Sequence, residues 1–429
     1  MNPYSELFER QRQLFATNVT RTYEWRVEQL DRMAAMVGDN EKELQQAVAE
    51  DFKTSPLEYD FETFTSLGEV LYQKSQLRTW MAPTEAPVPR RLRESGHTAK
   101  VIREPYGVTL VIGPFNGPLT LFIRPAIMVL GAGNPCVLKP SEALPATIGL
   151  FAQLVPKYFD PAAVTLVRGT RDQANRLLEL PFDFIFFTGS TRTGKVIARA
   201  AAENLTPTIL ECGGQNPALV DETANLADAA RKIVWGAMAW GGQWCTSPGY
   251  AYVQKSVADE FVSLAKAALV DLYGKDPSKN PDFSKVISER EVNRLISLID
   301  PKLVIAGGKA DPARRYLDPT LLYPVTWVDP VMEDEIFGPI LPILTYDALD
   351  EAFEQIAARP RPLAGFVFSR DQRNIDRFLM ELSFGGGAVN QTNIHLFVET
   401  MPFGGTGASG GGTTTARTGS TRSPTQRRF

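Results

Sequence analysis

The order of apolar and polar positions divides the chain into stretches of different character. Over residues 3–80, apolar side chains recur at roughly helical spacing among many charges, which predicts a series of helices. From Gly107 onward, short apolar runs alternate with helical stretches, which is typical of a parallel sheet covered by helices. A second alternating set begins after Gly213-Gly214. The pattern therefore predicts an α/β protein with two or more domains.

The first alternating set contains enough strands for one doubly wound, Rossmann-like nucleotide domain. Its strands are expected at residues 108–112, 135–139, 164–167, 184–187 and 208–211, and its helices at 119–130, 146–158, 173–180 and 193–203. The second set has candidate strands at 218–220, 250–253, 302–305, 340–344, 365–368 and 387–389. Helices are expected between them, such as those at 226–240, 257–272 and 349–358.

Three segments lack this alternation. Residues 82–97 are rich in proline and arginine and are expected to form a connector or an exposed arm, while residues 98–103 fit an edge strand. From Gly404 the chain is rich in Gly, Thr, Ser and Arg, which is typical of loop or disorder.

The composition argues against several classes of function. A net charge of -4 gives no electrostatic footprint for nucleic acid or an anionic membrane, and no apolar run is long enough for a membrane anchor. The polar N-terminus does not resemble a signal peptide, and three cysteines do not make a disulfide framework, so a reducing, cytoplasmic setting is expected. With two histidines, neither a histidine-based metal site nor a Ser-His-Asp triad is expected.

One thiol stands in an unusual position. Cys245 lies in the Gly-flanked segment 241–248, between a helical pattern and a strand pattern. Backbone N–H groups at such a break can lower a thiol's pKa and stabilise an oxyanion. The alternative is a small buried hydrophobe, which is the more common role for an arbitrary cysteine.

Two strand ends offer groups for a nucleotide. The segment 186–195 passes from a buried strand through Gly189 and Ser190 into a helix start, where N–H groups meet phosphates. Lys139 and Glu142 follow another strand and are placed to reach ribose hydroxyls. An ordinary capped helix and a surface lysine remain the alternatives. A literal G-x-G-x-x-G at residues 405–410 lacks the flanking strand and helix and is interpreted as a false match.

Glu211 and Asn116 complete the set of candidates. Glu211 ends a strand beside a Gly pair and is a candidate general base. Asn116 lies in a strand-to-helix loop, where its amide either donates to an oxyanion or simply shapes the turn.

Taken together and in order, these motifs resemble the aldehyde dehydrogenases, most closely the class-three-like branch, from about Glu6 to Gly412. The matching motifs are the Pro-Phe-Asn116 loop, Lys139-Pro-Ser-Glu142, Phe187-Thr-Gly-Ser-Thr191 with Gly194-Lys195, Glu211-Cys-Gly-Gly214, Gly242-Gln-Trp-Cys245, Glu335-Ile-Phe-Gly-Pro339 and Pro402-Phe-Gly-Gly405.

The resemblance implies a division into three parts. Residues 1–82 and 105–210 would form an NAD(P)-binding domain, and residues 211–396 a catalytic domain. Residues 83–104 and 397–429 would form an arm that joins two subunits into a homodimer.

The resemblance also implies roles. Cys245 would attack an aldehyde, Asn116 and the Cys245 N–H would hold the oxyanion, and Glu211 would activate the water that hydrolyses the thioester. Lys139 and Glu142 would bind the adenosine ribose, and Ser190, with Gly189 and Gly194 in the same motif, the pyrophosphate. Glu335 would bind the nicotinamide ribose beside Phe337. The implied cofactor is NAD, with NADP possible.

The sequence departs from the family pattern at several positions. Cys212 replaces the usual Leu, Gln215 an often-found Lys, Gly117 a common aromatic residue, and Trp244 a small residue or Thr. These departures bear on the aldehyde preferred, and Cys136 and Cys212 are interpreted as packing residues. The rival hypotheses are a CoA-acylating relative, a catalytically silent structural member of the fold and a plain nucleotide-binding module. Glu211 argues against the first, the full catalytic set against the second, and the thiol at the sheet edge against the third.

The last seventeen residues do not continue the family pattern. Residues 413–429 are compatible, codon by codon, with a one-base shift of a frame that would encode a family-like C-terminus. The hypothesis is that this shift, near codon 412, replaced the native end with an aberrant, disordered tail that weakens the dimer.

Overall fold

The apolar periodicity of the N-terminal stretch produces four helices. They are α1 (Ser5–Ala16), α2 (Tyr23–Gly38), α3 (Glu41–Asp51) and α4 (Pro56–Met81), with a 3₁₀ turn at Val19–Arg21. Thr22 caps α2 by accepting a 3.2 Å hydrogen bond from the Trp25 N–H, and Pro56 opens α4 where no N–H donor is needed. The computed structural model describes residues 2–398 and 401–412.

A six-stranded sheet follows, in the order β17-β7-β6-β3-β4-β5. Its parallel strands are β3 (Thr109–Ile112), β4 (Cys136–Lys139), β5 (Val164–Leu166), β6 (Phe184–Gly189) and β7 (Thr208–Cys212). The chain runs outward from β3 to β5 and then returns to β6 on the other side of β3. This reversal is the switch point at which doubly wound sheets bind ligands.

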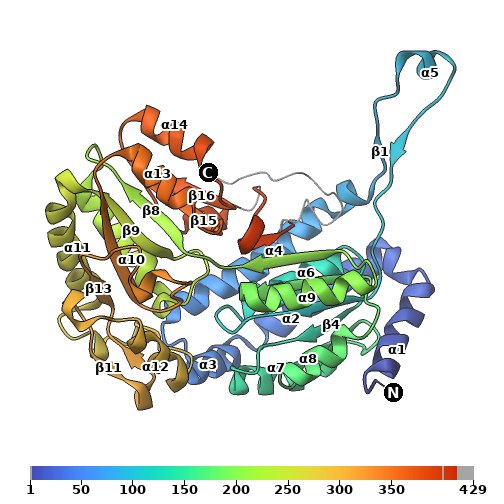
Figure 1. The fold of residues 1–429 in the computed structure, drawn as a ribbon. Helices are drawn as coiled ribbons and strands as arrows, with labels where there is room; N and C mark the ends of the chain where they lie inside the picture. Colours follow the sequence, from blue (N-terminus) through green and yellow to red (C-terminus); the bar gives the residue numbers. More distant parts are fainter. Residues whose placement is uncertain (1, 399–400, 413–429) are drawn as a thin grey trace.

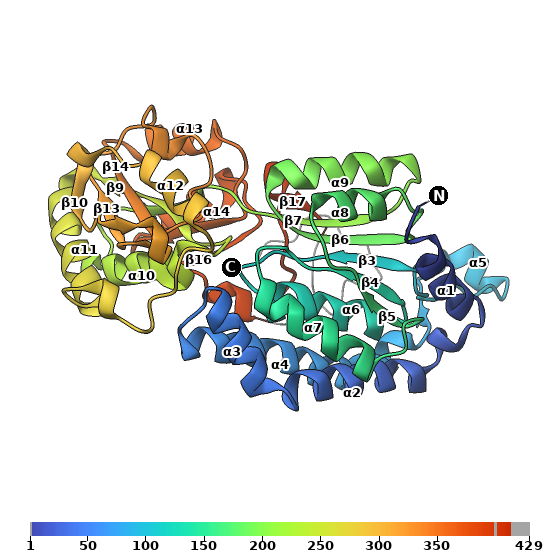
Figure 2. The same cartoon turned by 90° about the horizontal axis from the view of Figure 1, so that it is seen from below.

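Helices cover both faces of this sheet (Figure 2). A π-helical turn (Leu119–Ile123), α6 (Arg124–Gly131) and α7 (Pro145–Tyr158) lie with α2 and α4 on one face, and α8 (Arg171–Leu178) and α9 (Thr191–Glu203) on the other. Successive side chains of β3 point to opposite faces of the sheet, so Val111 belongs to the same hydrophobic cluster as Met33 of α2, and Leu110 to the same cluster as Ile197 of α9.

A second sheet, of seven strands, lies beside the first (Figure 1), in the order β10-β13-β14-β9-β8-β15-β16. Its strands are β8 (Asn216–Val220), β9 (Pro248–Gln254), β10 (Val304–Ala306), β13 (Thr320–Leu322), β14 (Ile340–Tyr346), β15 (Ala364–Phe368) and β16 (Gly386–Val389). Its helices are α10 (Leu226–Met238), α11 (Ala258–Tyr273), α12 (Glu289–Ser297), α13 (Leu349–Ala357) and α14 (Gln372–Glu381). Short 3₁₀ turns stand at Ala239–Gly242, Lys255–Val257, Pro277–Lys279, Pro301–Leu303, Pro312–Arg314, Pro330–Met332 and Ile394–Phe397.

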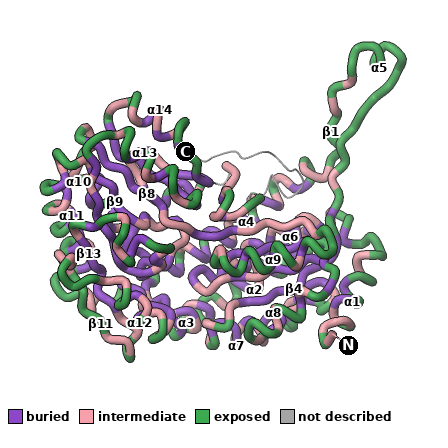
Figure 3. The backbone as a smooth tube through the Cα atoms, in the orientation of Figure 1, coloured by how far each residue is buried: buried purple, intermediate pink, exposed green. Residues whose placement is uncertain are grey.

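The proline- and arginine-rich segment forms an arm that projects from the molecule. β1 (Thr84–Glu85) and β2 (Lys100–Val101) pair as a two-stranded ribbon, and α5 (Arg90–Glu94) stands at its tip (Figure 1). The segment is an exposed arm, one of the two expectations, and most of its residues are coloured as exposed in Figure 3. The expected edge strand at 98–103 pairs with the arm itself instead of extending a large sheet.

Some sequence-based expectations were wrong. Short strands were missed, namely β13 and the hairpin of β11 (Ala310–Asp311) and β12 (Tyr316–Leu317). The strand expected from Lys302 begins only at Val304, after a 3₁₀ turn. The helices α12 and α14 are among those expected between the strands, although their bounds were not predicted. The Gly-rich segment after Gly404 was expected to be loop. It forms a 3₁₀ turn (Gly407–Ser409) and β17 (Gly410–Gly411), which pairs antiparallel with β7.

Two further observations concern the described residues only. None of the helices they form is long and apolar enough to cross a membrane. No group of three or more His, Cys, Asp or Glu side chains among them is arranged to hold a metal ion. The hypothesis about residues 413–429 lies outside the described residues.

Candidate active site

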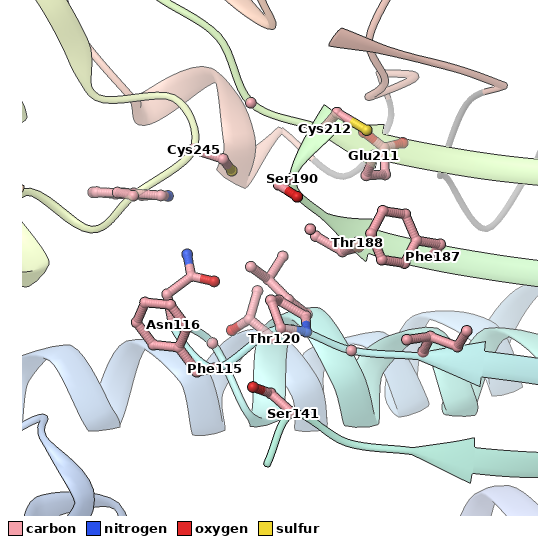
Figure 4. Close-up of a pocket in the computed structure, with 18 of the residues that line it drawn as sticks. Phe115, Asn116, Thr120, Ser141, Phe187, Thr188, Ser190, Glu211, Cys212 and Cys245 are labelled. Carbon is pink, nitrogen blue, oxygen red and sulfur yellow. The ribbon is translucent and has the colours of Figure 1, made fainter. Parts of the chain in front are cut away.

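A cavity of about 680 Å³ opens at the carboxyl ends of β3, β4, β6 and β7. The second sheet unit supplies its opposite wall, so residues far apart in the sequence meet there (Figure 4). Of the predicted site residues, those that line it are Asn116, Lys139, Glu142, Gly189, Ser190, Glu211, Cys245, Glu335 and Phe337.

The Cys245 loop begins where α10 ends. Trp240, Gly241 and Gly242 take left-handed backbone angles, with φ of 58°, 61° and 69°, which stops the helix at Met238. A β-carbon at Gly242 would overlap the main chain of Gly338, so glycine is required there. These constraints deliver Cys245, half-buried, to the cavity wall.

Two buried amides hold the Cys245 loop. Asn216 donates from Nδ2 to the carbonyl oxygens of Cys245 (2.9 Å) and Ser247 (2.8 Å). Gln243 donates from Nε2 to Lys285 O (2.9 Å) and accepts from the Ile287 N–H (2.9 Å). Because buried polar groups are costly to leave unpaired, this network favours one loop conformation.

Burial raises the pKa of the Cys245 thiol, and the nearby carboxylates of Glu335 and Glu211 raise it further. The N–H groups of Cys245 and Thr246 act in the opposite direction but do not prevail. The N–H groups therefore lower this pKa as expected, but burial and the two carboxylates outweigh them. A neutral thiol in such a site needs a base to become a nucleophile.

Asn116 reaches the same place from β3. It is buried in the loop that follows the strand, and its Nδ2 donates a 2.9 Å hydrogen bond to the carbonyl oxygen of Gln243. In Figure 4 its amide nitrogen points toward the side from which Cys245 enters the cavity. The two loops are thus joined directly, close to the thiol.

Two carboxylates line the cavity near the thiol. Glu211 is buried at the end of β7, and the half-buried Glu335 lies over Gly213, where a β-carbon would overlap its carboxylate. Burial raises the pKa of Glu335 to about 7, against the opposing effect of the Gly214 N–H. Glu335, expected at a ribose, is therefore also an electrostatic neighbour of Cys245.

The far end of the cavity carries the predicted nucleotide residues. Lys139 is buried at the end of β4, where its Nζ donates to Pro140 O (2.7 Å) and lies 3.9 Å from the Glu142 carboxylate. Burial lowers the Lys139 pKa, and Glu142 opposes that shift. Ser190 caps α9 by accepting a 3.3 Å hydrogen bond from the Thr193 N–H.

Three predicted residues act through backbone shape. A β-carbon at Gly189 would lie 2.6 Å from the Phe187 ring, and one at Gly194 would lie 2.9 Å from Sγ of Cys212. Gly194 is not among the described residues that line the cavity; it lets α9 pack closely on β7. Phe337 has a left-handed φ of 48° and meets Phe115 edge-on at 5.8 Å.

This arrangement can be compared with known proteins. The profile of the Aldehyde dehydrogenase family matches residues 7–426. The chain belongs to the aldehyde dehydrogenase family. The match continues past Gly412, where the family pattern was expected to stop.

Individual aldehyde dehydrogenases support the assignment. The 4,4'-diaponeurosporen-aldehyde dehydrogenase of Staphylococcus aureus is 37% identical over 96% of this chain and 90% of its own. The mouse dimeric NADP-preferring aldehyde dehydrogenase is 38% identical over 96% of this chain and 91% of its own. A substrate-bound structure of Staphylococcus aureus AldH aligns with a TM-score of 0.95 at 36% identity, covering 98% of this chain and 92% of that one.

These findings confirm the resemblance, the α/β fold class and the reaction class. The protein is an NAD(P)-dependent oxidoreductase that acts on aldehydes. Neither the CoA-acylating nor the silent structural alternative is favoured by the named relatives.

Sequence reasoning missed an aromatic wall of this aldehyde dehydrogenase. The ring of Trp244 packs against that of Trp240 at a tilt of 42°, with ring centres 4.2 Å apart. Phe61 meets Phe397 at 4.5 Å, and Trp244 lies 6.4 Å from Phe397. All four rings line the cavity. Only Trp244 was singled out, because it adjoins Cys245. The other rings come from separate elements, which no local pattern links.

Proposed function

We propose that Cys245 is the nucleophile of aldehyde oxidation, with Asn116 and the Cys245 N–H as oxyanion donors. The observation that carries this proposal is the joining of the two loops by the Asn116–Gln243 hydrogen bond beside the thiol. The Cys245 thiol first gives its proton to solvent; attack of the thiolate sulfur on the aldehyde carbon then forms a thiohemiacetal oxyanion, and donors placed at its oxygen stabilise the developing charge.

Glu211 is the base in this proposal. It lines the same cavity as Cys245, and its carboxylate is one of the charges that raise the Cys245 pKa, which supports this role. After oxidation leaves a thioester on Cys245, Glu211 takes a proton from water, and the water oxygen replaces sulfur at the acyl carbon. A carboxylic acid and the free thiol result.

The polar end of the cavity fits NAD(P). The hydrogen-bond donors at this end are the Lys139 ammonium, the Ser190 hydroxyl and the N–H groups at the N-terminus of α9. Such donors suit the hydroxyl and phosphate oxygens of a dinucleotide. Lys139 and Glu142 would hold the adenosine ribose, Ser190 with Gly189 the pyrophosphate, and Glu335 and Phe337 the nicotinamide end. The cofactor, when bound, accepts hydride from the substrate carbon.

The substrate is proposed to be an apolar aldehyde. The wall formed by Phe61, Trp240, Trp244 and Phe397 offers ring faces and little charge, which favours flat or extended hydrocarbon chains.

The assembly and setting are part of the same proposal. The protein acts as a homodimer in a reducing, cytoplasmic environment, and residues 83–104 with 397–429 form the joining arm. The exposed β1–β2 ribbon and the name of the mouse dimeric relative support the dimer. Residues 1–82 with 105–210 are the cofactor domain, and residues 211–396 the catalytic domain.

Formation of NAD(P)H tests the proposal. Wild-type protein is assayed with aliphatic aldehydes of increasing chain length, aromatic aldehydes and a charged semialdehyde. We expect kcat/KM to rise with apolar surface and to be lowest for the semialdehyde. Cys245→Ser should abolish turnover while NAD binding is retained, because a hydroxyl is a far poorer nucleophile than a thiolate. More than a few per cent residual turnover would exclude Cys245 as the nucleophile.

A further inference from the structure

Three charged side chains are buried behind the reacting groups. Lys53, Glu58 and Glu62 are 1%, 7% and 3% exposed, and the two glutamates stand one turn apart on α4. Replacing a buried ion pair by apolar groups is often neutral or stabilising, so stability alone does not account for such a cluster. Its contacts lead instead to the two catalytic loops.

Lys53 and Glu62 hold the Asn116 loop at both ends. The Lys53 ammonium forms an ion pair with Glu62 Oε1 and donates to the carbonyl oxygen of Asn116 at 3.1 Å. Glu62 Oε2 accepts from the N–H groups of Leu119 (2.8 Å) and Thr120 (3.3 Å). The main chain from Asn116 to Thr120 is therefore tied to one point on α4.

Glu58 holds the start of the Cys245 loop. Its Oε1 accepts from the Trp240 N–H at 2.7 Å, at the residue where the left-handed backbone begins, and its Oε2 accepts from Ser284 Oγ at 2.6 Å. Lys53 Nζ also lies 5.2 Å from the centre of the Trp240 ring, so the lysine touches both loops.

We propose that Lys53, Glu58 and Glu62 are positioning residues that set the distance between the Asn116 amide and Cys245. This inference rests on the proposed oxyanion role of Asn116. Glu58 and Glu62 lie four residues apart on the continuous helix α4, which keeps their separation nearly constant. The helix therefore fixes the distance between the two loops that these glutamates bind. On the cavity side, the two loops are close enough for Asn116 to form its hydrogen bond with Gln243.

A double-mutant cycle tests the proposal. The paired change Lys53→Met with Glu62→Gln removes one charge of each sign, so the net charge of the buried cluster stays the same while its contacts to the Asn116 loop are lost or weakened. We expect the rate constant of the NADH burst to fall on the order of 10²-fold, because a displacement of about 1 Å has that effect on a reacting geometry. The dissociation constant for NAD should stay unchanged.

The decisive comparison uses Asn116→Ala. If the cluster acts through Asn116, adding the paired change to Asn116→Ala lowers the burst rate by no more than about twofold. If the fold-losses in burst rate of the paired change and of Asn116→Ala multiply in the combined variant, the inference is overturned. An undiminished burst in Asn116→Ala alone would instead refute the proposed function, so the two failures are distinguishable.

Two further variants control for folding. Glu62→Asp keeps the charge but withdraws the carboxylate by one methylene, and it should show the same non-additivity with a smaller loss. Asp51→Asn is the matched control, because Asp51 is buried and accepts from the N–H groups of Ala146 (3.0 Å) and Thr147 (2.8 Å) at α7. It should lower thermal stability while leaving the burst rate intact. An equal burst loss in Asp51→Asn would overturn the positioning role.

Discussion

The side-chain nitrogen of Asn116 lies 2.9 Å from the carbonyl oxygen of Gln243, two residues before Cys245. This hydrogen bond joins a loop of the first sheet unit to a loop of the second. The proposed oxyanion donor and the proposed nucleophile are therefore fixed relative to each other, although they are far apart in the sequence. Electrostatic stabilisation of a transition state depends on such preorganised donors.

Glu211→Gln should separate the two halves of the reaction. An amide cannot take a proton from water, so thioester hydrolysis should slow far more than oxidation. Rapid mixing is expected to show a burst of NADH followed by a slow steady state. Equal slowing of both phases would mean that Glu211 is not specific to hydrolysis.

Trp244→Thr should change which aldehydes are accepted. Removing the indole opens the aromatic wall formed with Trp240 and Phe397, so kcat/KM should shift from flat aromatic toward bulkier or branched aldehydes. Trp235→Phe is the control, since Trp235 packs on Trp244 at 6.1 Å but is not among the described residues lining the cavity. The same substrate profile in Trp244→Thr and wild type would contradict the proposal.

The elevated pKa of Glu335 predicts a pH-dependent stability. Burial raises this pKa from 4.5 to about 7, so the folded protein keeps a proton that the unfolded chain loses near 4.5. Between these values the unfolded state binds fewer protons, so the free energy of unfolding contributed by this group falls as pH rises. Urea unfolding at pH 5 and pH 8 measures the difference. Glu335→Gln should flatten it, and an unchanged pH slope in that variant would count against this assignment.

Glu142 should set the balance between NAD and NADP. Its exposed carboxylate stands 3.9 Å from the Lys139 ammonium, where a 2′-phosphate would be repelled and a hydroxyl accepted. We expect NAD to be used at least as well as NADP. Glu142→Gln should raise kcat/KM for NADP relative to NAD by roughly tenfold, equivalent to about 1.4 kcal/mol. A strong NADP preference in the wild type would refute this role.

Local patterns predicted much of the first sheet unit. The strand from Cys136 to Lys139 is a buried apolar run that ends at a lysine, and the break at Gly241-Gly242 follows from glycine's freedom at positive φ. Such signals need only neighbouring residues, so a single sequence contains them. The family could be identified from the ordered motifs for the same reason, since each motif is a short run of neighbouring residues.

Other features depended on partners distant in the sequence. Gly410–Gly411 has no apolar side chain to mark a strand, and it becomes one only because the edge of β7 offers main-chain hydrogen bonds. β13 spans only Thr320–Leu322, too short to show a period.

The chemistry of the site was also determined partly by the sequence and partly by the tertiary structure. The sequence alone determined that Cys245, Glu211 and Asn116 are present in family order. Only the tertiary structure decided that burial and two carboxylates raise the Cys245 pKa. It also decided that Glu58 and Glu62, which look like surface charges of an amphipathic helix, lie buried against the catalytic loops. Burial and electrostatic interaction depend on distance in space, which residue order does not specify.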